Sequence, residues 1–224
     1  MALILNLETT TTNCSVSLSQ DGETLVLKEH ADAGYSHGEK LHLFINEVFK
    51  QAGINPKAID AVAVSKGPGS YTGLRIGVAS AKGLAFSLEK PLISVSTLQA
   101  LALQVREDDG LVIPLLDARR MEVYSAVFNA DNEPLREIKA EVLQEELYQT
   151  YLDKGLVYFI GNAVEKTKSV IVHPNARFVE GKLPSASTMG NLAELKYKKN
   201  DIEDVAYFEP FYLKDFVAVK SKTI

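Results

Sequence analysis

The segment 67–73, which reads GPGSYTG, contains the residue types best suited to binding an anion. A glycine loop before a helix can offer backbone N–H groups to a phosphate. It lacks the Gly-Lys-Ser/Thr ending of a Walker A loop, and its third glycine falls at 73, not at the 72 that a dinucleotide fingerprint requires. The alternative is structural: Gly67 and Gly69 shape a turn between a strand and a helix that Thr72 caps.

Glu8, at the end of the apolar run 3–8, is a candidate carboxylate for a site at this loop. We therefore keep a nucleotide contact open as a hypothesis. Its candidate residues are Glu8, Thr9, Gly67, Gly69 and Ser70.

The sequence gives little support for a metal site or a catalytic nucleophile. The histidines at positions 30, 37, 42 and 173 form no pair at the i, i+4 spacing that places two imidazoles on one helical face. Cys14 has no basic neighbour to lower its pKa, and no G-x-S-x-G elbow occurs. We predict no metal site and no catalytic residue.

Small residues follow the loop in a predicted helix over about 72–88. Gly73, Gly77 and Ala81 recur every four residues and form one smooth face. Each glycine inside a helix costs about 0.5–1 kcal/mol relative to alanine, so a closely packed neighbour should require them. From the residues alone, a second chain and an internal helix contact explain them equally well.

The surrounding pattern predicts the order β-β-β-α-β-α-β-α over the first hundred residues, which is a mixed sheet with helices on it. A hairpin is predicted at 111–128, helices near 141–152 and 185–197, and a strand at 156–161. A boundary falls near 105–110.

Composition limits the partners and the compartment. The formal net charge of −5 argues against a protein that binds nucleic acid unaided. A single cysteine excludes an intrachain disulfide and favours the cytoplasm. The first residues, MALILNLE, indicate neither a signal peptide nor a membrane span.

Several segments together resemble the bacterial TsaB (YeaZ) family, which takes part in making the threonylcarbamoyladenosine of tRNA. They are LILNLETTTTNCSVSL, YSHGEKLHLFINEVF, VAVSKGPGSYTGLRIGVASAKGLA, VSTLQALA, DARRMEVY and FEPFYLKD. The resemblance implies the α/β fold of actin, Hsp70 and hexokinase, with two related subdomains of mixed β-sheets flanked by helices. We place them at 1–105 and 106–224, with a C-terminal tail that could pack back on the first.

The related catalytic family, TsaD, carries a His-x-x-x-His metal pair that this chain lacks. Thr97 and Leu101 stand at the matching positions, and neither can replace an imidazole ligand. Glu8 also replaces the aspartate usual in the superfold, which argues against autonomous ATP chemistry. The alternative function remains an independent ATP-dependent phosphotransferase or hydrolase that uses Glu8 and the 67–73 loop.

The resemblance therefore implies a non-catalytic subunit that supports a TsaD-like threonylcarbamoyltransferase, together with a TsaE-like ATPase. It implies no cofactor of its own, ATP or ADP only at the interface with the partner, indirect contact with tRNA, no membrane contact, and a homodimer when alone. The glycines are then interpreted as space for a docked neighbour. The implied partner-binding residues are Leu41, Ile45, Tyr71, Gly73, Leu74, Arg75, Gly77, Val78 and Ala81.

Overall fold

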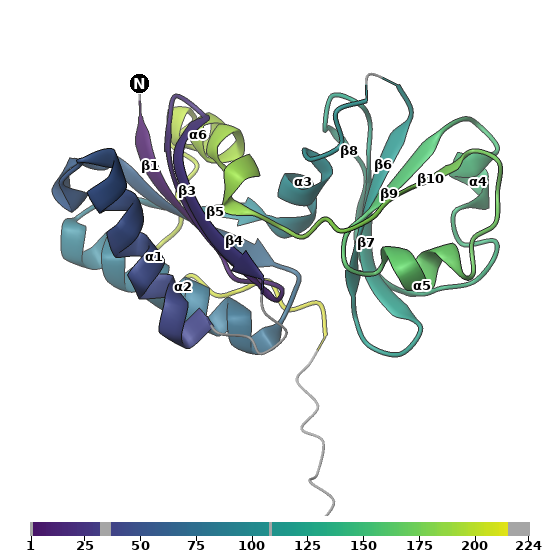
Figure 1. Ribbon diagram of the computed structural model, residues 1–224, viewed down its shortest axis with the longest axis horizontal. Helices are drawn as coiled ribbons and strands as arrows, with labels where there is room; N and C mark the ends of the chain where they lie inside the picture. The colour runs from purple at the N-terminus through teal and green to yellow at the C-terminus, as the bar shows by residue number, and fades with distance from the viewer. Residues whose placement is uncertain (1, 32–36, 108, 215–224) are drawn as a thin grey trace, which may run out of the picture.

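A computed structural model describes residues 2–31, 37–107 and 109–214, which form two lobes, each built on its own sheet (Figure 1). The sequence also predicts that Ser36, with Glu39 three residues later, caps the helix that follows, and Ser36 lies outside the described residues. Within them, no helix is both long and apolar enough to cross a membrane.

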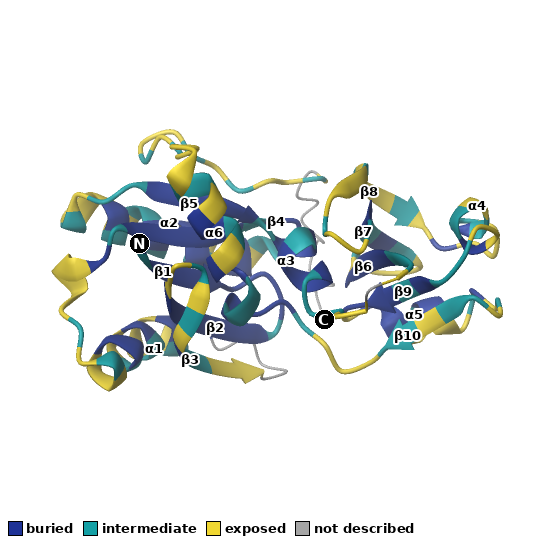
Figure 2. Cartoon of the chain, turned by 90° about the horizontal axis from the view of Figure 1, so that it is seen from above, coloured by how far each residue is buried: buried dark blue, intermediate teal, exposed yellow. Residues whose placement is uncertain are grey.

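The first lobe contains a five-stranded mixed sheet in the order β3-β2-β1-β4-β5. Its strands are β1 (Leu3–Glu8), β2 (Asn13–Gln20), β3 (Glu23–Ala31), β4 (Ala61–Gly67) and β5 (Leu92–Ser96). The first three form the predicted antiparallel meander, and β4 and β5 join it in parallel. Because helices cover both faces, nearly every residue of β1, β2 and β4 is buried (Figure 2).

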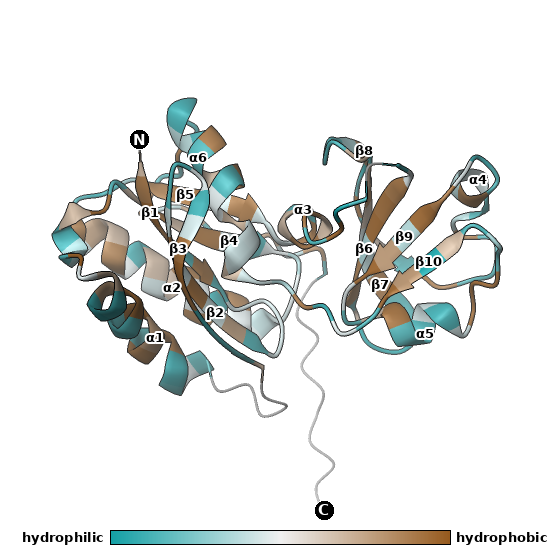
Figure 3. Cartoon of the chain, turned by 45° about the horizontal axis from the view of Figure 1, so that its top comes forward, coloured by the Kyte–Doolittle hydropathy of each residue, from teal (hydrophilic) through white to brown (hydrophobic). Residues whose placement is uncertain are grey.

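Two long helices, α1 (His37–Ala52) and α2 (Tyr71–Leu88), cover one face of this sheet. Leucine, isoleucine, valine and phenylalanine side chains recur at helical spacing on the inner side of α1, which favours an amphipathic helix packed on the sheet. Between α1 and β4 lies a short 3-10 helix, η1 (Pro56–Ala58). The hydrophobic stripes of α1 and α2 are visible in Figure 3.

The second lobe contains another five-stranded mixed sheet, ordered β10-β9-β6-β7-β8. Its strands are β6 (Leu111–Asp117), β7 (Glu122–Phe128), β8 (Pro134–Val142), β9 (Val157–Ile160) and β10 (Ala176–Val179). The short helices α4 (Gln149–Leu152) and α5 (Val164–Lys168) accompany it. Helix α3 (Thr97–Ala102) packs on its other side, between the lobes (Figure 1).

The chain then returns to the first lobe. The 3-10 helix η2 (Ala186–Thr188) and helix α6 (Gly190–Lys198) pack on the first sheet, opposite α1 and α2. Residues 203–211 follow β5, α2 and the end of β4. The second subdomain is predicted at 106–224, with a C-terminal tail that could pack back on the first. The segment that packs on the first lobe begins already at residue 186, because non-local packing brings η2 and α6 onto the first sheet.

Two element predictions in the second lobe also need correction. The helix predicted at 141–152 is reduced to α4, because residues 134–142 form the edge strand β8 instead. Strand β10 was not predicted at all. Both strands have mostly exposed or half-buried residues, so they lack the apolar alternation that marks a strand in a sequence.

Candidate functional site

Helix α2 starts at the glycine loop, and Ser70 caps it, where Thr72 was predicted to do so. The Ser70 Oγ accepts a hydrogen bond from the Gly73 N–H at 3.3 Å. Gly67 has a φ of 111°, a left-handed conformation that glycine adopts without a steric penalty. The loop thus has the structural role proposed for it, and it brings the first turn of α2 beside the β1–β2 turn.

The glycines Gly73 and Gly77 pack against that β1–β2 turn of the same chain. A Cβ at Gly73 would lie 2.0 Å from the Thr9 carbonyl oxygen, and a Cβ at Gly77 would lie 2.2 Å from the Thr9 Oγ1. The Thr9 hydroxyl donates a hydrogen bond to the Gly73 carbonyl at 2.7 Å. These two glycines therefore give Thr9 its place against α2, and the interpretation that they make room for a docked neighbour is wrong.

Gly83 differs from them. No atom lies within 4 Å of a Cβ built at this position, and the residue is exposed. It shares one side of α2 with Ala79 and Phe86, at spacings of four and three residues. Gly83 is thus the glycine within α2 for which the described part of the chain supplies no steric reason.

Most of the predicted partner-binding side chains belong to the core of the first lobe. The buried ones are Leu41, Ile45, Gly73, Leu74, Gly77, Val78 and Ala81. They face the sheet or the neighbouring helix, so they offer no surface to a partner while this fold persists, and for them the prediction is corrected. Arg75 is exposed and Tyr71 is half-buried.

The outer sides of the two helices carry other residues. The Ser80 Oγ lies 3.3 Å from the His42 Nε2, which joins α2 to α1. Leu43 is 53% exposed and Phe86 is 80% exposed. We call Leu43, Ala79, Gly83 and Phe86, with His42 and Ser80, the outer helical face.

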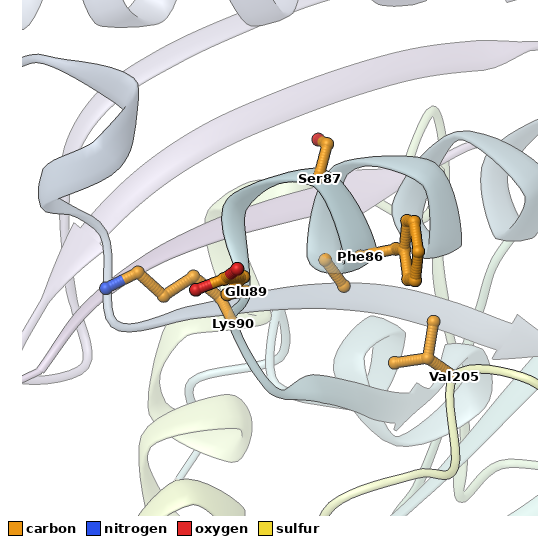
Figure 4. Close-up of a pocket in the computed structure, with 6 residues that line it drawn as sticks. Phe86, Ser87, Glu89, Lys90 and Val205 are labelled. Carbon is orange, nitrogen blue, oxygen red and sulfur yellow. The ribbon is translucent and has the colours of Figure 1, made fainter.

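Phe86 lies near the C-terminal end of α2, and in Figure 4 its ring and the Val205 side chain lie close together. With Ala85, Ser87, Glu89 and Lys90 they line a shallow surface hollow. This hollow extends the apolar surface of α2 onto the returning C-terminal segment.

Glu8 does not face a ligand, because its side chain is completely buried. One carboxylate oxygen accepts hydrogen bonds from the Thr10 N–H at 2.6 Å and the Thr10 hydroxyl at 2.5 Å. The other accepts a hydrogen bond from the Ser65 hydroxyl. Burial raises the Glu8 pKa, and these hydrogen bonds lower it in part. Glu8 therefore joins the ends of β1 and β4.

The remaining nucleotide candidates are divided. Thr9 and Gly67 are buried, the first against α2 and the second beneath the Phe211 carbonyl. Gly69 and Ser70 do line a cavity between the lobes. The prediction of a direct nucleotide contact is therefore corrected for Glu8, Thr9 and Gly67. Gly69 and Ser70 lie at the cavity, where such a contact would have to be made.

The cavity between the lobes has a volume of about 590 Å³. Thr10, Thr11 and the glycine loop form its first-lobe wall, and the β6–β7 turn forms its second-lobe wall. The segment 211–214 lies along it. This segment is held at Phe211, whose N–H donates a hydrogen bond to the Lys66 carbonyl at 2.7 Å.

Sequence reasoning noted the β6–β7 turn but missed its position at this cavity. Arg119 and Arg120 have φ values of 68° and 49°, left-handed conformations that cost non-glycine residues of order 1–3 kcal/mol each. Hydrogen bonds hold the turn, from the Arg119 N–H to the Asp117 carboxylate at 2.9 Å and from the Glu122 N–H to the Arg119 carbonyl at 3.1 Å. The available signal was two arginines where tight turns usually have asparagine or glycine.

No cluster of three or more histidine, cysteine, aspartate or glutamate side chains suited to a metal occurs within the described residues. Thr97 and Leu101, at the positions of the missing histidine pair, are fully buried. The Thr97 Oγ1 accepts a hydrogen bond from the Gly67 N–H at 3.2 Å. Thr97 thus joins α3 to the glycine loop, and Leu101 packs in the hydrophobic cluster that α3 shares with β6 and β7.

Comparison with known proteins agrees with this geometry. The family model described as TsaD, tRNA N6-adenosine threonylcarbamoyltransferase, matches residues 31–222. A Bacillus subtilis protein named tRNA threonylcarbamoyladenosine biosynthesis protein TsaB is 33% identical over 75% of this chain and 74% of its own length. The Escherichia coli protein of that name is 30% identical over 97% of this chain and 96% of its own.

Among solved structures, YeaZ from Pseudomonas aeruginosa superimposes with a TM-score of 0.82 at 27% identity, covering 95% of this chain and 100% of that one. The two mixed sheets with flanking helices place the chain in the actin-like, two-lobed class of α/β proteins. Within that class, the chain belongs to the TsaB family of tRNA threonylcarbamoyladenosine biosynthesis proteins, related to the TsaD threonylcarbamoyltransferases.

Proposed function

We propose that this chain is the non-catalytic subunit of a threonylcarbamoyladenosine-forming complex, and that it docks through the outer helical face onto a TsaD-type threonylcarbamoyltransferase. The observation that carries the proposal is an apolar surface on α1 and α2 with no covering element in the described chain. Leu43 and Phe86 are large, exposed and apolar. An exposed apolar surface of this kind marks interaction sites.

Gly83 gives this surface a specific shape. A glycine here lowers helix propensity by about 0.5–1 kcal/mol and is not required by any described contact. A partner helix that approaches the α2 backbone closely would use the missing side chain. Burial of apolar surface at about 25 cal/mol per Å² needs only about 40 Å² to offset that cost.

The site chemistry supports a subunit without its own reaction. Glu8 is enclosed by Thr10 and Ser65, so it offers no carboxylate to a substrate. The alternative, an independent phosphotransferase or hydrolase, depends on that carboxylate and loses its main residue. The proposal also includes ATP or ADP at the interface with the catalytic subunit and a TsaE-type ATPase as third component. It further includes indirect contact with tRNA, a cytoplasmic location and self-pairing through the same face.

Reconstitution tests the function. The TsaD-type and TsaE-type proteins from the same source are mixed with unmodified tRNA, threonine, bicarbonate, ATP and the enzyme that forms the threonylcarbamoyl adenylate. Formation of threonylcarbamoyladenosine should require this chain. Equal product without the chain would contradict the proposal, and ATP turnover by the chain alone that Glu8→Gln abolishes would support the phosphotransferase alternative.

A further inference from the structure

The cavity between the lobes presents aromatic and cationic side chains that the proposed docking does not use. Tyr71, Tyr212, Arg119 and Arg120 all line it. The two tyrosine rings lie 5.2 Å apart at 41°, and the Arg75 guanidinium lies 4.3 Å from the centre of the Tyr71 ring. Tyr212 is 38% exposed, so a planar ligand can reach its ring.

The charge of this wall is positive although the chain carries −5 overall. Both carboxylates that line the cavity are paired with lysine ammonium groups. These pairs are Asp117 with Lys166, at 2.6 Å, and Glu122 with Lys214. Arg119 and Arg120 enter no ion pair with another described residue at the salt-bridge distance, so they provide the excess positive charge.

We propose that this wall binds a single-stranded stretch of RNA, with a base stacked on Tyr212 and backbone phosphates at Arg119 and Arg120. Aromatic rings beside cationic groups are the usual means of binding single strands, because every base has a face that can stack. The inference rests on the proposed function, in which the complex acts on tRNA. It adds a direct contact with tRNA to the indirect contact made through the catalytic subunit.

The structure favours an RNA strand over a free nucleotide. A buried triphosphate would need unused polar groups at the floor of the cavity. Two hydroxyl groups that line the cavity already have partners: the Thr10 hydroxyl bonds to Glu8, and the Ser70 hydroxyl caps α2. Arg119 and Arg120 are exposed, as binding of an extended phosphodiester chain requires.

Fluorescence anisotropy with a short, labelled RNA that cannot pair with itself tests the proposal, at two salt concentrations. The probe is titrated with the isolated chain and with its complex with the catalytic subunit. Arg119→Gln/Arg120→Gln should weaken binding about ten-fold or more at low salt. It should also reduce the slope of log affinity against log salt by about 1.4, near 0.7 for each lost phosphate contact. Tyr212→Ala should weaken binding roughly five-fold or more.

Arg106→Gln/Arg177→Gln is the matched control, because it removes the same charge at two residues that do not line the cavity. In the strand register, Arg177 of β10 lies opposite Tyr158 of β9, and Tyr158 lies opposite Val112 near the start of β6. The cavity lies at the other end of β6, at Asp117. Asp117 lies five positions after Val112, about 16 Å along the strand. The control should bind RNA like the parent.

The outcomes separate this inference from the docking proposal. Loss of RNA binding in the cavity variants, with catalytic-subunit binding kept, supports the inference. Equal RNA affinity for the parent and both arginine double variants overturns it. The docking proposal is then decided separately, by titration of the chain with the catalytic subunit. Tight, Arg119-dependent binding of ATP without RNA binding would also overturn it. If the chain fails to bind the catalytic subunit, the docking proposal fails, and RNA titration of the isolated chain still decides this inference.

Discussion

Alanine substitution at two glycines of α2 separates internal packing from docking. At Gly83 a methyl group meets no atom within 4 Å, so alanine should raise the free energy of unfolding by about 0.5–1 kcal/mol through helix propensity. At Gly77 the same methyl group would lie 2.2 Å from the Thr9 Oγ1. Moving Thr9 should cost about 1–3 kcal/mol of overpacking and about 1 kcal/mol for its hydrogen bond to Gly73.

The gain in helix propensity offsets less than half of that cost in most of this range, so Gly77→Ala should destabilise the chain by roughly 1–3 kcal/mol net. Urea denaturation of the two variants beside the parent measures both changes. Opposite signs at Gly77 and Gly83 are the expected result. Stabilisation by Gly77→Ala would refute the packing of Thr9 against α2 and would restore a role for that glycine in docking.

Three further results are expected. Glu8→Gln should gain stability relative to the parent between pH 4 and pH 8 in urea melts. The folded-state pKa of Glu8 is raised, so the parent loses stability as the unfolded state ionises above about 4.5; a pH-independent difference would contradict this. Tyr148→Phe should lose about 1 kcal/mol less stability than the parent at pH 11 relative to neutral pH, because burial raises the Tyr148 pKa to about 12; identical alkaline melts would oppose it. Elemental analysis of the purified chain should find no stoichiometric iron or zinc, given Thr97 and Leu101; one tightly held metal per chain would show a site that these residues do not predict.

The first lobe could be predicted closely from sequence because its signals are local. Alternating residues in β2, a turn at Asp21-Gly22 and the apolar spacing of α1 each act within a few positions. The second lobe was predicted less well, because β8 is an edge strand with a solvated side. The return of 186–198 to the first sheet could not be predicted from local pattern.

The candidate site shows the same limit. The glycine loop and its helix were identified, but the partners of Gly73 and Gly77 lie more than sixty positions away, at Thr9. Glu8 looked available in the sequence because Ser65, which encloses it, is also distant. Side-chain direction around α2 therefore decided which residues reach the surface, and the residue types alone left that open.

Docking through the outer helical face is tested most directly by sedimentation velocity of the chain mixed with the TsaD-type subunit. Phe86→Asp and Gly83→Leu change this face without touching the core, and Val172→Asp, at a second-lobe side chain 90% exposed, is the matched control. Both α2 variants should stay folded and lose the complex, each weakening affinity by about ten-fold or more, while Val172→Asp should bind like the parent. Unchanged complex formation by Phe86→Asp and Gly83→Leu would show that docking does not use this face.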